Sequence, residues 1–301
     1  MRIKDYLSKG EIVYFTDKSD FHGWRLLINN WLAIVAIFAV VASYTNPLTI
    51  LIALFLLGGR QLGLAVLMHE CGHRSLFKTA KLNDVLGQWL CALPIMNDLP
   101  SYARGHLKHH RAAGTTEDPD LPNYQSYPVS RQSFRRKITR DLSGRTGIKL
   151  LTYLVKGSAT AMSNEKREGA WPLFQQIAVQ LLMIFVLSLF GVAWLYLLWA
   201  GAYLTTFMLF IRLRQVAEHA AVPDLFDLDP RKNTRTVIPR WWERGLLAPN
   251  MVNYHMEHHF MASVPCYRLR ELHRHLQAKG ALSDMPQFVG YPAVFKHAVG
   301  A

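Results

Sequence analysis

Cysteine is scarce in this sequence. The 301 residues contain 3 cysteines, Cys71, Cys91 and Cys266, and no Cys-x-x-Cys pair. This excludes a disulfide framework and a set of cysteine ligands for an iron–sulfur cluster, and it indicates a reducing compartment. We expect the three thiols to behave as small buried hydrophobic groups rather than as metal ligands.

Charged side chains, and acidic ones in particular, are also few. Only 18% of the residues are charged and 50% are hydrophobic, with 34 Lys and Arg against 21 Asp and Glu and a net charge of +13. A chain this apolar is unusual for a soluble protein and predicts a membrane protein. The basic residues lie between apolar runs, as expected at an anionic membrane face, and no nucleic-acid-reading motif is present.

Several recognisable segments are missing as well. Residues 1–25 lack the apolar core of a signal peptide, so we expect no cleaved targeting segment. No internal repeat of roughly 20–50 residues occurs, which favours a single domain over residues 1–301. The sequence shows no dinucleotide-binding fingerprint and no fused haem domain, so electrons for any redox reaction must come from a separate carrier, such as a ferredoxin or a cytochrome.

What the sequence does have is long apolar runs. A helix rises about 1.5 Å per residue, so about 20 apolar residues cross the hydrocarbon core of a bilayer. Runs of this kind predict an all-α integral membrane protein with spans at residues 26–43, 48–68, 171–190 and 194–213. Leu82–Met96 is amphipathic and too short to span, which favours an interfacial or re-entrant piece.

The distribution of basic residues predicts the topology. The connections after the first and third spans are short and carry no Lys or Arg. Nearly all basic residues lie in segments 1–25, 74–170 and 214–301, and the positive-inside rule places these three segments in the cytosol. We expect the membrane to be a bacterial inner membrane.

Eight of the 13 histidines gather in three short windows: His69 and His73; His106, His109 and His110; His255, His258 and His259. Side chains spaced by three or four residues share one face of a helix, so each window directs its imidazoles to one point. Neutral imidazole is a good ligand for transition metals. All three windows fall on the same predicted side of the membrane, and eight imidazoles exceed what one zinc ion needs. They suit two metals with four or five imidazoles each.

The first window permits a different interpretation. His69-Glu70-Cys71-Gly72-His73 matches the H-E-x-x-H pattern, in which two histidines bind zinc and the glutamate is the general base. A membrane zinc metalloprotease is therefore an alternative from another class of enzyme. A non-catalytic metal-binding membrane protein is a third.

Taken together, the windows resemble the histidine boxes of the membrane fatty acid desaturase family, which includes related hydroxylases and ketolases. The family pattern is H-x(3–4)-H followed by two copies of H-x(2–3)-H-H, and the resemblance covers nearly the whole chain. The segments Asn253–His259 and Pro265–His273 look like the third box and the residues after it. The resemblance implies four spanning helices in two hairpins, a cytosolic helical cap and two iron ions with O₂ as co-substrate.

The resemblance also implies a reaction and one more ligand. The reaction would be desaturation of a fatty acyl chain; hydroxylation, ketolation and oxidative decarboxylation of a fatty acid share the same oxidant. Removing hydrogen from an alkyl chain requires a redox-active metal, which zinc is not. The extra ligand just past the fourth span is best matched by His219, with Gln215 one turn earlier as a supporting residue.

Acidic residues near the boxes are candidates for holding the ring N–H groups of the ligands, although each is equally interpretable as a solvated carboxylate. They are Glu70, Glu218, Glu257, Asp98, Asp118 and Asp120. The four remaining histidines, His22, His273, His275 and His297, are expected at the surface or the membrane interface. Arg60 lies about 14 Å deeper in its helix than His69 and is a candidate contact for a substrate carboxylate; binding to backbone carbonyls is the alternative.

Overall fold

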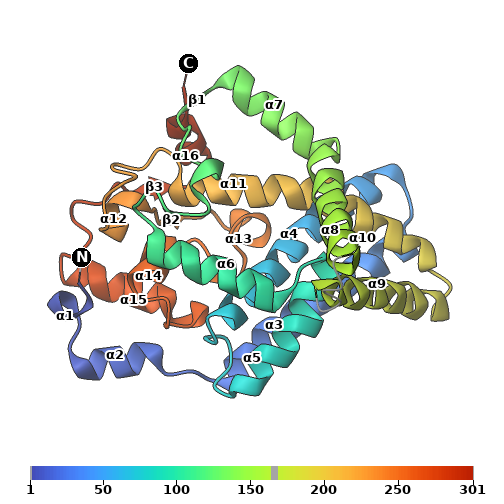
Figure 1. Cartoon of the computed structure of the whole chain (residues 1–301), viewed down its shortest axis with the longest axis horizontal. Coiled ribbons are helices and arrows are strands. Elements are labelled where there is room, and N and C mark those ends of the chain that lie inside the picture. The colour runs from blue at the N-terminus through green and yellow to red at the C-terminus, as the bar shows by residue number, and fades with distance from the viewer. Residues whose placement is uncertain (1, 164–168, 301) are drawn as a thin grey trace.

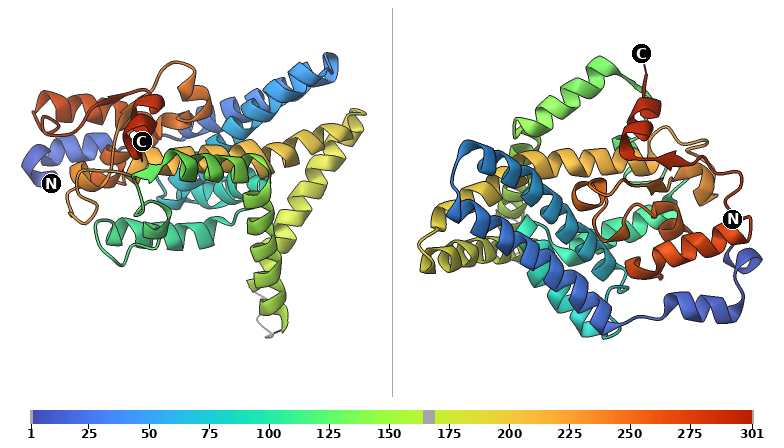
Figure 2. Two further views of the ribbon diagram at one scale, coloured as in Figure 1. Left: turned by 90° about the horizontal axis from the view of Figure 1, so that it is seen from above. Right: turned by 180° about the vertical axis from the view of Figure 1, so that it is seen from behind.

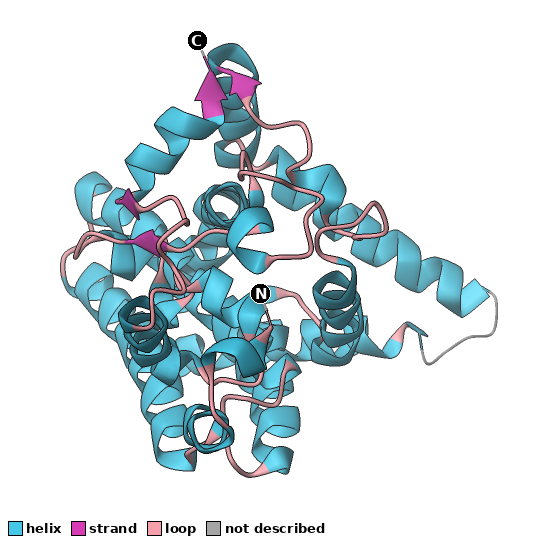
Figure 3. Cartoon of the chain, turned by 90° about the vertical axis from the view of Figure 1, so that its left-hand side faces the viewer, coloured by secondary structure: helices cyan, strands magenta, loops and turns pink. Residues whose placement is uncertain are grey.

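The computed structural model describes residues 2–163 and 169–300, and helices form most of it (Figure 1). The α-helices are α1 Ile3–Tyr6, α2 Lys9–Thr16, α3 Asp20–Ser43, α4 Pro47–Gly72, α5 Ala80–Leu86, α6 Leu99–Ala112, α7 Arg131–Leu142, α8 Arg145–Ser163, α9 Trp171–Leu189, α10 Tyr196–Ala202, α11 Met208–His219, α12 Pro230–Asn233, α13 Glu243–Leu246, α14 His255–Phe260, α15 Cys266–Ala278 and α16 Tyr291–Ala298. Four strands of two residues each are the main addition to the helical fold expected from the sequence (Figure 3).

Four helical segments are long and apolar enough to cross a membrane, as predicted: α3, α4, α9 and the continuous stretch Ala193–His219. The second and fourth extend beyond the predicted ends at residues 68 and 213. Both extensions carry polar side chains that are buried in the protein, including His69 and Glu218. Hydropathy detects where a helix leaves the apolar phase, whereas these helices continue because protein packs around their ends.

Helix α4 is the centre of the molecule and contacts α3, α6, α10 and α11. Two of its glycines permit this packing. A Cβ added at Gly63 would meet Oδ1 of Asn30 on α3, and one added at Gly58 would meet Thr206. Thr206 lies in the π-helical segment η6 (Tyr203–Phe207), and its hydroxyl donates to Leu54 O at 2.6 Å. The fourth span thus departs from α-helical geometry where it approaches α4.

The amphipathic segment Leu82–Met96 folds as α5 followed by a π-helical turn, η1 (Gly87–Ala92), and a 3-10 turn, η2 (Leu93–Ile95). It packs against α4 and leads into α6. Helices α8 and α9 contact each other and project from the rest of the molecule (Figure 2). The undescribed residues 164–168 lie between them, within the long segment predicted to be cytosolic.

The C-terminal section returns to the ends of the spanning helices. Strand β1 (Val129–Ser130) pairs in parallel with β4 (Val299–Gly300), and β2 (Val237–Ile238) pairs in parallel with β3 (Phe288–Val289). Two apolar clusters pack against the C-terminal half of α4; one contains Leu67 and the other contains Leu62. Cys71, Cys91 and Cys266 are free and buried together in the first cluster, which confirms their expected hydrophobic character.

Candidate metal centre

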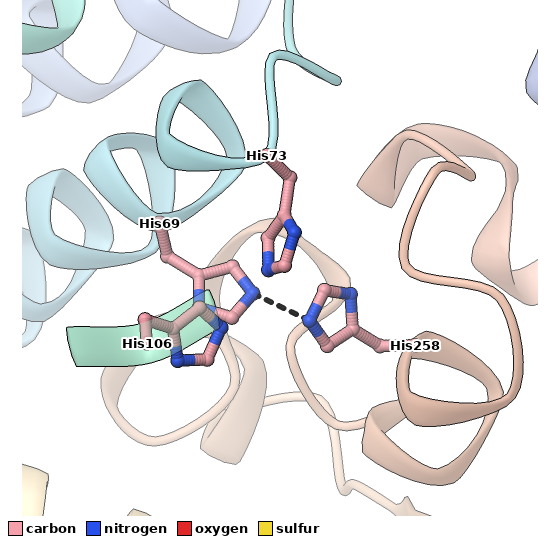
Figure 4. Close-up of side chains that lie close together, drawn as sticks. All are labelled: His69, His73, His106 and His258. Carbon is pink, nitrogen blue, oxygen red and sulfur yellow. Dashed lines mark hydrogen bonds between the residues drawn. The ribbon is translucent and has the colours of Figure 1, made fainter. Parts of the chain in front are cut away.

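The structure brings all nine predicted ligand histidines together from four segments of the chain. Two groups of four have ligand nitrogens within 4.8 Å of one another: His69, His73, His106 and His258; His109, His219, His255 and His259. Figure 4 shows the first group, in which rings from α4, α6 and α14 point toward one another.

Local sequence explains how each segment presents its histidines. Asp98 caps α6 by accepting the backbone N–H of Ser101 at 3.0 Å, and the helix runs far enough to place its three histidines in its last two turns. The first histidine pair occupies the C-terminal end of α4, as predicted, and His219 is the last residue of α11. Short helix α14 carries the remaining three.

The Nε2 atoms of these rings face one another at short range. His258 Nε2 lies 2.9 Å from His69 Nε2, and His255 Nε2 lies 2.8 Å from His219 Nε2. His110 joins the first group, because its Nε2 lies 3.0 Å from that of His106 and 2.9 Å from that of His258. Its ring also stacks on that of His259, with centroids 4.3 Å apart, so it connects the two groups.

Groups outside the cluster bind the other ring nitrogen of several histidines. Nδ1 of His109 lies 2.8 Å from Asp118 Oδ1, and Nδ1 of His219 lies 3.3 Å from the carbonyl oxygen of Asn233. Both partners are acceptors, so each Nδ1 carries the proton and each Nε2 turns its lone pair into the cluster. Metal-binding histidines in proteins show this arrangement.

Burial lowers the pKa of six imidazoles of the cluster that lie outside the spanning helices. It lowers the pKa of His73 to about 4 and that of His110 to about 2. The pKa of His106, His255, His258 and His259 also lies well below the ordinary value, with burial as the main cause and neighbouring imidazoles as the next. These rings are therefore neutral at pH 7, which is the protonation state that binds a metal.

The donor set fits transition metals. Two imidazole nitrogens bound at about 2.1 Å to one ion, at right angles, lie about 3 Å apart, as the facing Nε2 atoms do here. The buried Nε2 of His73 has no hydrogen-bond partner among the described residues. Lone pairs gathered this closely without a cation between them are unfavourable, and a bound ion would remove that cost.

Three of the six candidate carboxylates lie beside ligand rings. Asp118 is the closest, and the hydroxyl of Tyr124 also donates to it. Burial alone would raise the pKa of the Asp118 carboxyl, but the two hydrogen bonds outweigh burial and hold that pKa below its usual value. Asp120 lies 3.8 Å from the same nitrogen of His109, and Glu218 lies 3.6 Å from His255 Nδ1.

The other three carboxylates are used elsewhere. Asp98 caps α6, as described, and accepts from Gln88 at 3.1 Å. Glu257 is fully buried and lies 2.5 Å from Nδ1 of His273 and 2.5 Å from the hydroxyl of Thr236. The expected surface position of His273 is therefore wrong: its ring is buried because it bonds this glutamate.

Glu70 points away from the histidines. Its carboxylate accepts from the Ser75 hydroxyl at 2.8 Å and from the backbone N–H of Cys266 at 2.9 Å, and the side chain is buried. A general base must reach a metal-bound water, and these bonds hold the carboxylate elsewhere. The geometry therefore disfavours the zinc protease alternative.

Arg60 and Gln215 also have definite positions. The guanidinium of Arg60 donates to the carbonyl oxygen of Gly245 and, at 3.4 Å, to Oδ1 of Asn30. Of the two interpretations of Arg60, the structure therefore matches binding to a backbone carbonyl. Gln215 makes no hydrogen bond to His219 within the described chain; it faces a cavity instead.

The cavity of about 690 Å³ lies between α6 and α11, closed on one side by α8, and its size is typical of a small-molecule site. His106, His109, His219 and His255 form part of its wall, so it touches both histidine groups. Apolar side chains of the fourth span and of α8 line the part farther from the histidines. A substrate in this cavity would lie directly against the candidate metal site.

Sequence reasoning missed three residues beside the cluster. Tyr102 places its hydroxyl 3.0 Å from His69 Nδ1 and stacks on His106, and Tyr124 stacks on His219. Arg214 is bonded to Glu218 at 2.6 Å. Tyr102 stands one helical turn before His106, and this spacing was the signal available in the sequence.

Comparison with known proteins agrees with this site. The chain is similar to dihydrorhizobitoxine desaturase of Bradyrhizobium elkanii, with 28% identity over 73% of the chain and 65% of that protein, slightly less than two thirds of its length. It is also similar to an sn-1 acyl-lipid omega-3 desaturase (ferredoxin) of Nostoc sp. (23% identity; 84% and 73% of the two chains) and an sn-1 oleoyl-lipid 12-desaturase of Picosynechococcus sp. (26%; 82% and 74%). The family model described as fatty acid desaturase matches residues 45–291. With more than half of its length matched, the chain belongs to the fatty acid desaturase family.

Proposed function

We propose that this chain is an O₂-dependent di-iron membrane oxidoreductase that introduces a double bond into the hydrocarbon part of a lipid or fatty acyl substrate. The observation that carries the proposal is the pair of histidine groups, whose inward nitrogens lie as close together as the ligands of two metal ions require. Family membership and the names of the relatives support desaturation over the other reactions of this oxidant.

We assign nine histidines to two iron ions. His69, His73, His106, His110 and His258 would hold the first, and His109, His219, His255 and His259 the second. His110 goes with the first because its nitrogen faces two members of that group. Its ring stacks on that of His259, so the ligand set of the first iron would contact the ligand set of the second.

The chain's own residues prepare the site for this chemistry. When bound, two irons would together supply the electrons that activate O₂. Asp118 and the Asn233 carbonyl hold protons on the outer nitrogens and so fix the ring orientations. The cavity would place an apolar substrate against four of the histidines.

For the reaction to balance, two hydrogens leave adjacent carbons of the substrate. Together with two electrons from a separate donor and two protons from water, they reduce O₂ to two molecules of water. Two relatives carry ferredoxin in their names, which supports an iron–sulfur protein as the donor. Exposed arginines such as Arg135 and Arg140 on α7 suit an acidic carrier or anionic lipid.

We further propose that the four spans form two hairpins, α3 with α4 and α9 with the fourth span, in a bacterial inner membrane. The positive-inside rule supports a cytosolic location for both termini and for the histidines. The α6–α8 segment and the C-terminal section would then form a helical cap over the metal site.

Metal analysis of the purified protein, combined with O₂ uptake, tests the proposal. We expect about two irons per chain, substrate-dependent O₂ consumption with a reduced ferredoxin, and unsaturated products in lipid profiles of cells that express the chain. His109→Ala and His258→Ala, one from each group, should abolish the activity, whereas His297→Ala, at an exposed position, should not.

Two outcomes would overturn it. One zinc and no iron, with proteolytic activity that survives both substitutions, would favour the protease. Bound iron without O₂ consumption, whatever the electron donor, would indicate a metal-binding protein without catalysis.

A further inference from the structure

The cavity beside the histidines changes character along the fourth span. Tyr203, Phe207, Met208 and Ile211 give it an apolar wall, and one turn later the wall becomes polar. The polar part contains Arg214, Gln215 and Glu218, followed directly by His219. A purely hydrocarbon chain would offer no acceptor to Gln215 or to the free N–H groups of Arg214 at the point nearest the candidate metal site.

Arg214 is the strongest feature of this polar end. Its side chain is only 14% exposed, and its Nε donates to Glu218 Oε1 at 2.6 Å. A guanidinium has five N–H donors, and no other hydrogen bond to Arg214 occurs in the described parts of the chain. Arg214 lines the cavity, so its remaining N–H donors are available to a ligand there.

Neighbouring amides add donors to the same place. Gln215 makes no side-chain hydrogen bond within residues 2–163 and 169–300. Asn97 uses its Oδ1 to accept the backbone N–H of Asp98 at 2.8 Å, which leaves its amide N–H₂ for the cavity. Three side chains with free donors therefore face one space, in which Glu218 is paired with Arg214 and the Asp120 carboxylate lies on the side of His109, 3.8 Å from its Nδ1. A ligand that only accepts hydrogen bonds, and that matches a planar guanidinium, is a carboxylate.

The guanidinium also lies close to the ligand rings. Glu218 Oε1 is 2.6 Å from Arg214 Nε and 3.6 Å from His255 Nδ1. The same Glu218 oxygen thus lies between the guanidinium and the ring of His255. A carboxylate bound by Arg214 would thus place the carbons next to it against the histidines, with the tail along Phe207 toward α8.

We propose that the substrate is a free carboxylic acid with an apolar tail, whose carboxylate is bound by Arg214 with Gln215 and Asn97. This inference rests on the proposed desaturase function and narrows it in two respects. The substrate enters as a free acid rather than as an ester within a phospholipid. The double bond forms near its carboxyl end, with the same consumption of O₂, donor electrons and protons as above.

Binding of octanoate, laurate and palmitate, compared with their methyl esters, tests the inference in the iron-loaded full-length protein. We expect the acids to raise the thermal unfolding temperature at concentrations roughly ten- to a hundredfold lower than the esters, as a charge-assisted bidentate contact predicts. Arg214→Lys keeps a positive charge for Glu218 but loses the planar fork, so it should remove most of this preference. Its iron content should match that of the wild type, which separates substrate binding from positioning of His255.

Arg212→Lys is the matched control. Arg212 lies on the same helix and is also paired, with Asp141 Oδ1 at 2.9 Å, but it is outside the cavity wall. Esters that bind as tightly as acids, or an Arg214→Lys variant that loses acid and ester binding equally, would overturn the inference. The thermal assay needs no turnover. A protein without iron or O₂ consumption would therefore refute the proposed function and still show whether acids are preferred.

Discussion

Replacing Asp118 by Asn isolates the effect of one carboxylate on one half of the metal centre. Asp118 Oδ1 accepts the Nδ1–H of His109 at 2.8 Å, and its side chain is 2% exposed. An asparagine can still accept this bond through its amide oxygen, so the ring keeps its tautomer, but the negative charge that raises the basicity of the ligand is lost. We expect the affinity for the second iron to fall about 10- to 100-fold, which corresponds to about 1.4–2.8 kcal/mol.

A chelator competition with the iron-loaded protein measures this loss. At a chelator concentration that leaves the wild type with its full iron content, Asp118→Asn should retain about half of its iron, because the first histidine group is not in contact with Asp118. Asp120→Asn is the control, since it removes the same charge from a carboxylate 3.8 Å from the same nitrogen, beyond hydrogen-bond range. Equal iron loss in the two variants would refute the reasoning, because any negative charge near His109, and not specifically the one hydrogen-bonded to its Nδ1, would then be responsible.

Three further predictions concern stability. His273→Ala leaves the buried carboxylate of Glu257 without its main partner and should cost about 3 kcal/mol in thermal or denaturant unfolding, whereas the exposed His297→Ala should be neutral. Gly63→Ala puts a Cβ into contact with helix α3 and should lower stability by about 1–3 kcal/mol; an unchanged melting temperature would contradict the close packing. The metal-free protein should lose stability as the pH falls from 6.5 toward about 4, because the unfolded chain binds protons that buried rings such as His73 do not; a pH-independent melting temperature over this range would argue against it.

The features that the sequence predicts well are those set by local spacing or by composition. The apolar runs give four spanning helices, and the three- and four-residue spacing of the histidines gives the face that each helix presents. Glu257, by its sequence position a candidate to hold a ligand ring, is turned away from His255, because two residues of helix correspond to about 200° of rotation. That carboxylate accordingly bonds His273 rather than a ligand of the cluster.

The remaining features depend on contacts that local pattern does not encode. His219 is held by the backbone carbonyl of Asn233, and any residue type could supply that group. His69 meets His258 across 189 positions of sequence, and only the packing of α14 against the ends of the spanning helices determines that encounter. The bonds of Glu70 to Ser75 and Cys266 have the same origin, which is why a zinc-protease motif could stand in the sequence without its geometry.

The order in which the ligands occur along the chain has a consequence for biosynthesis. The first group lacks His258, and the second lacks both His255 and His259, until the ribosome has passed residue 259. By then all four helices that are long and apolar enough to cross a membrane have been synthesised. Under the proposed assignment, neither iron has its full ligand set before that point, and His69, His73 and His219 are made before the partners that α14 supplies. Metal binding would then join α14 to the ends of helices that are made before it.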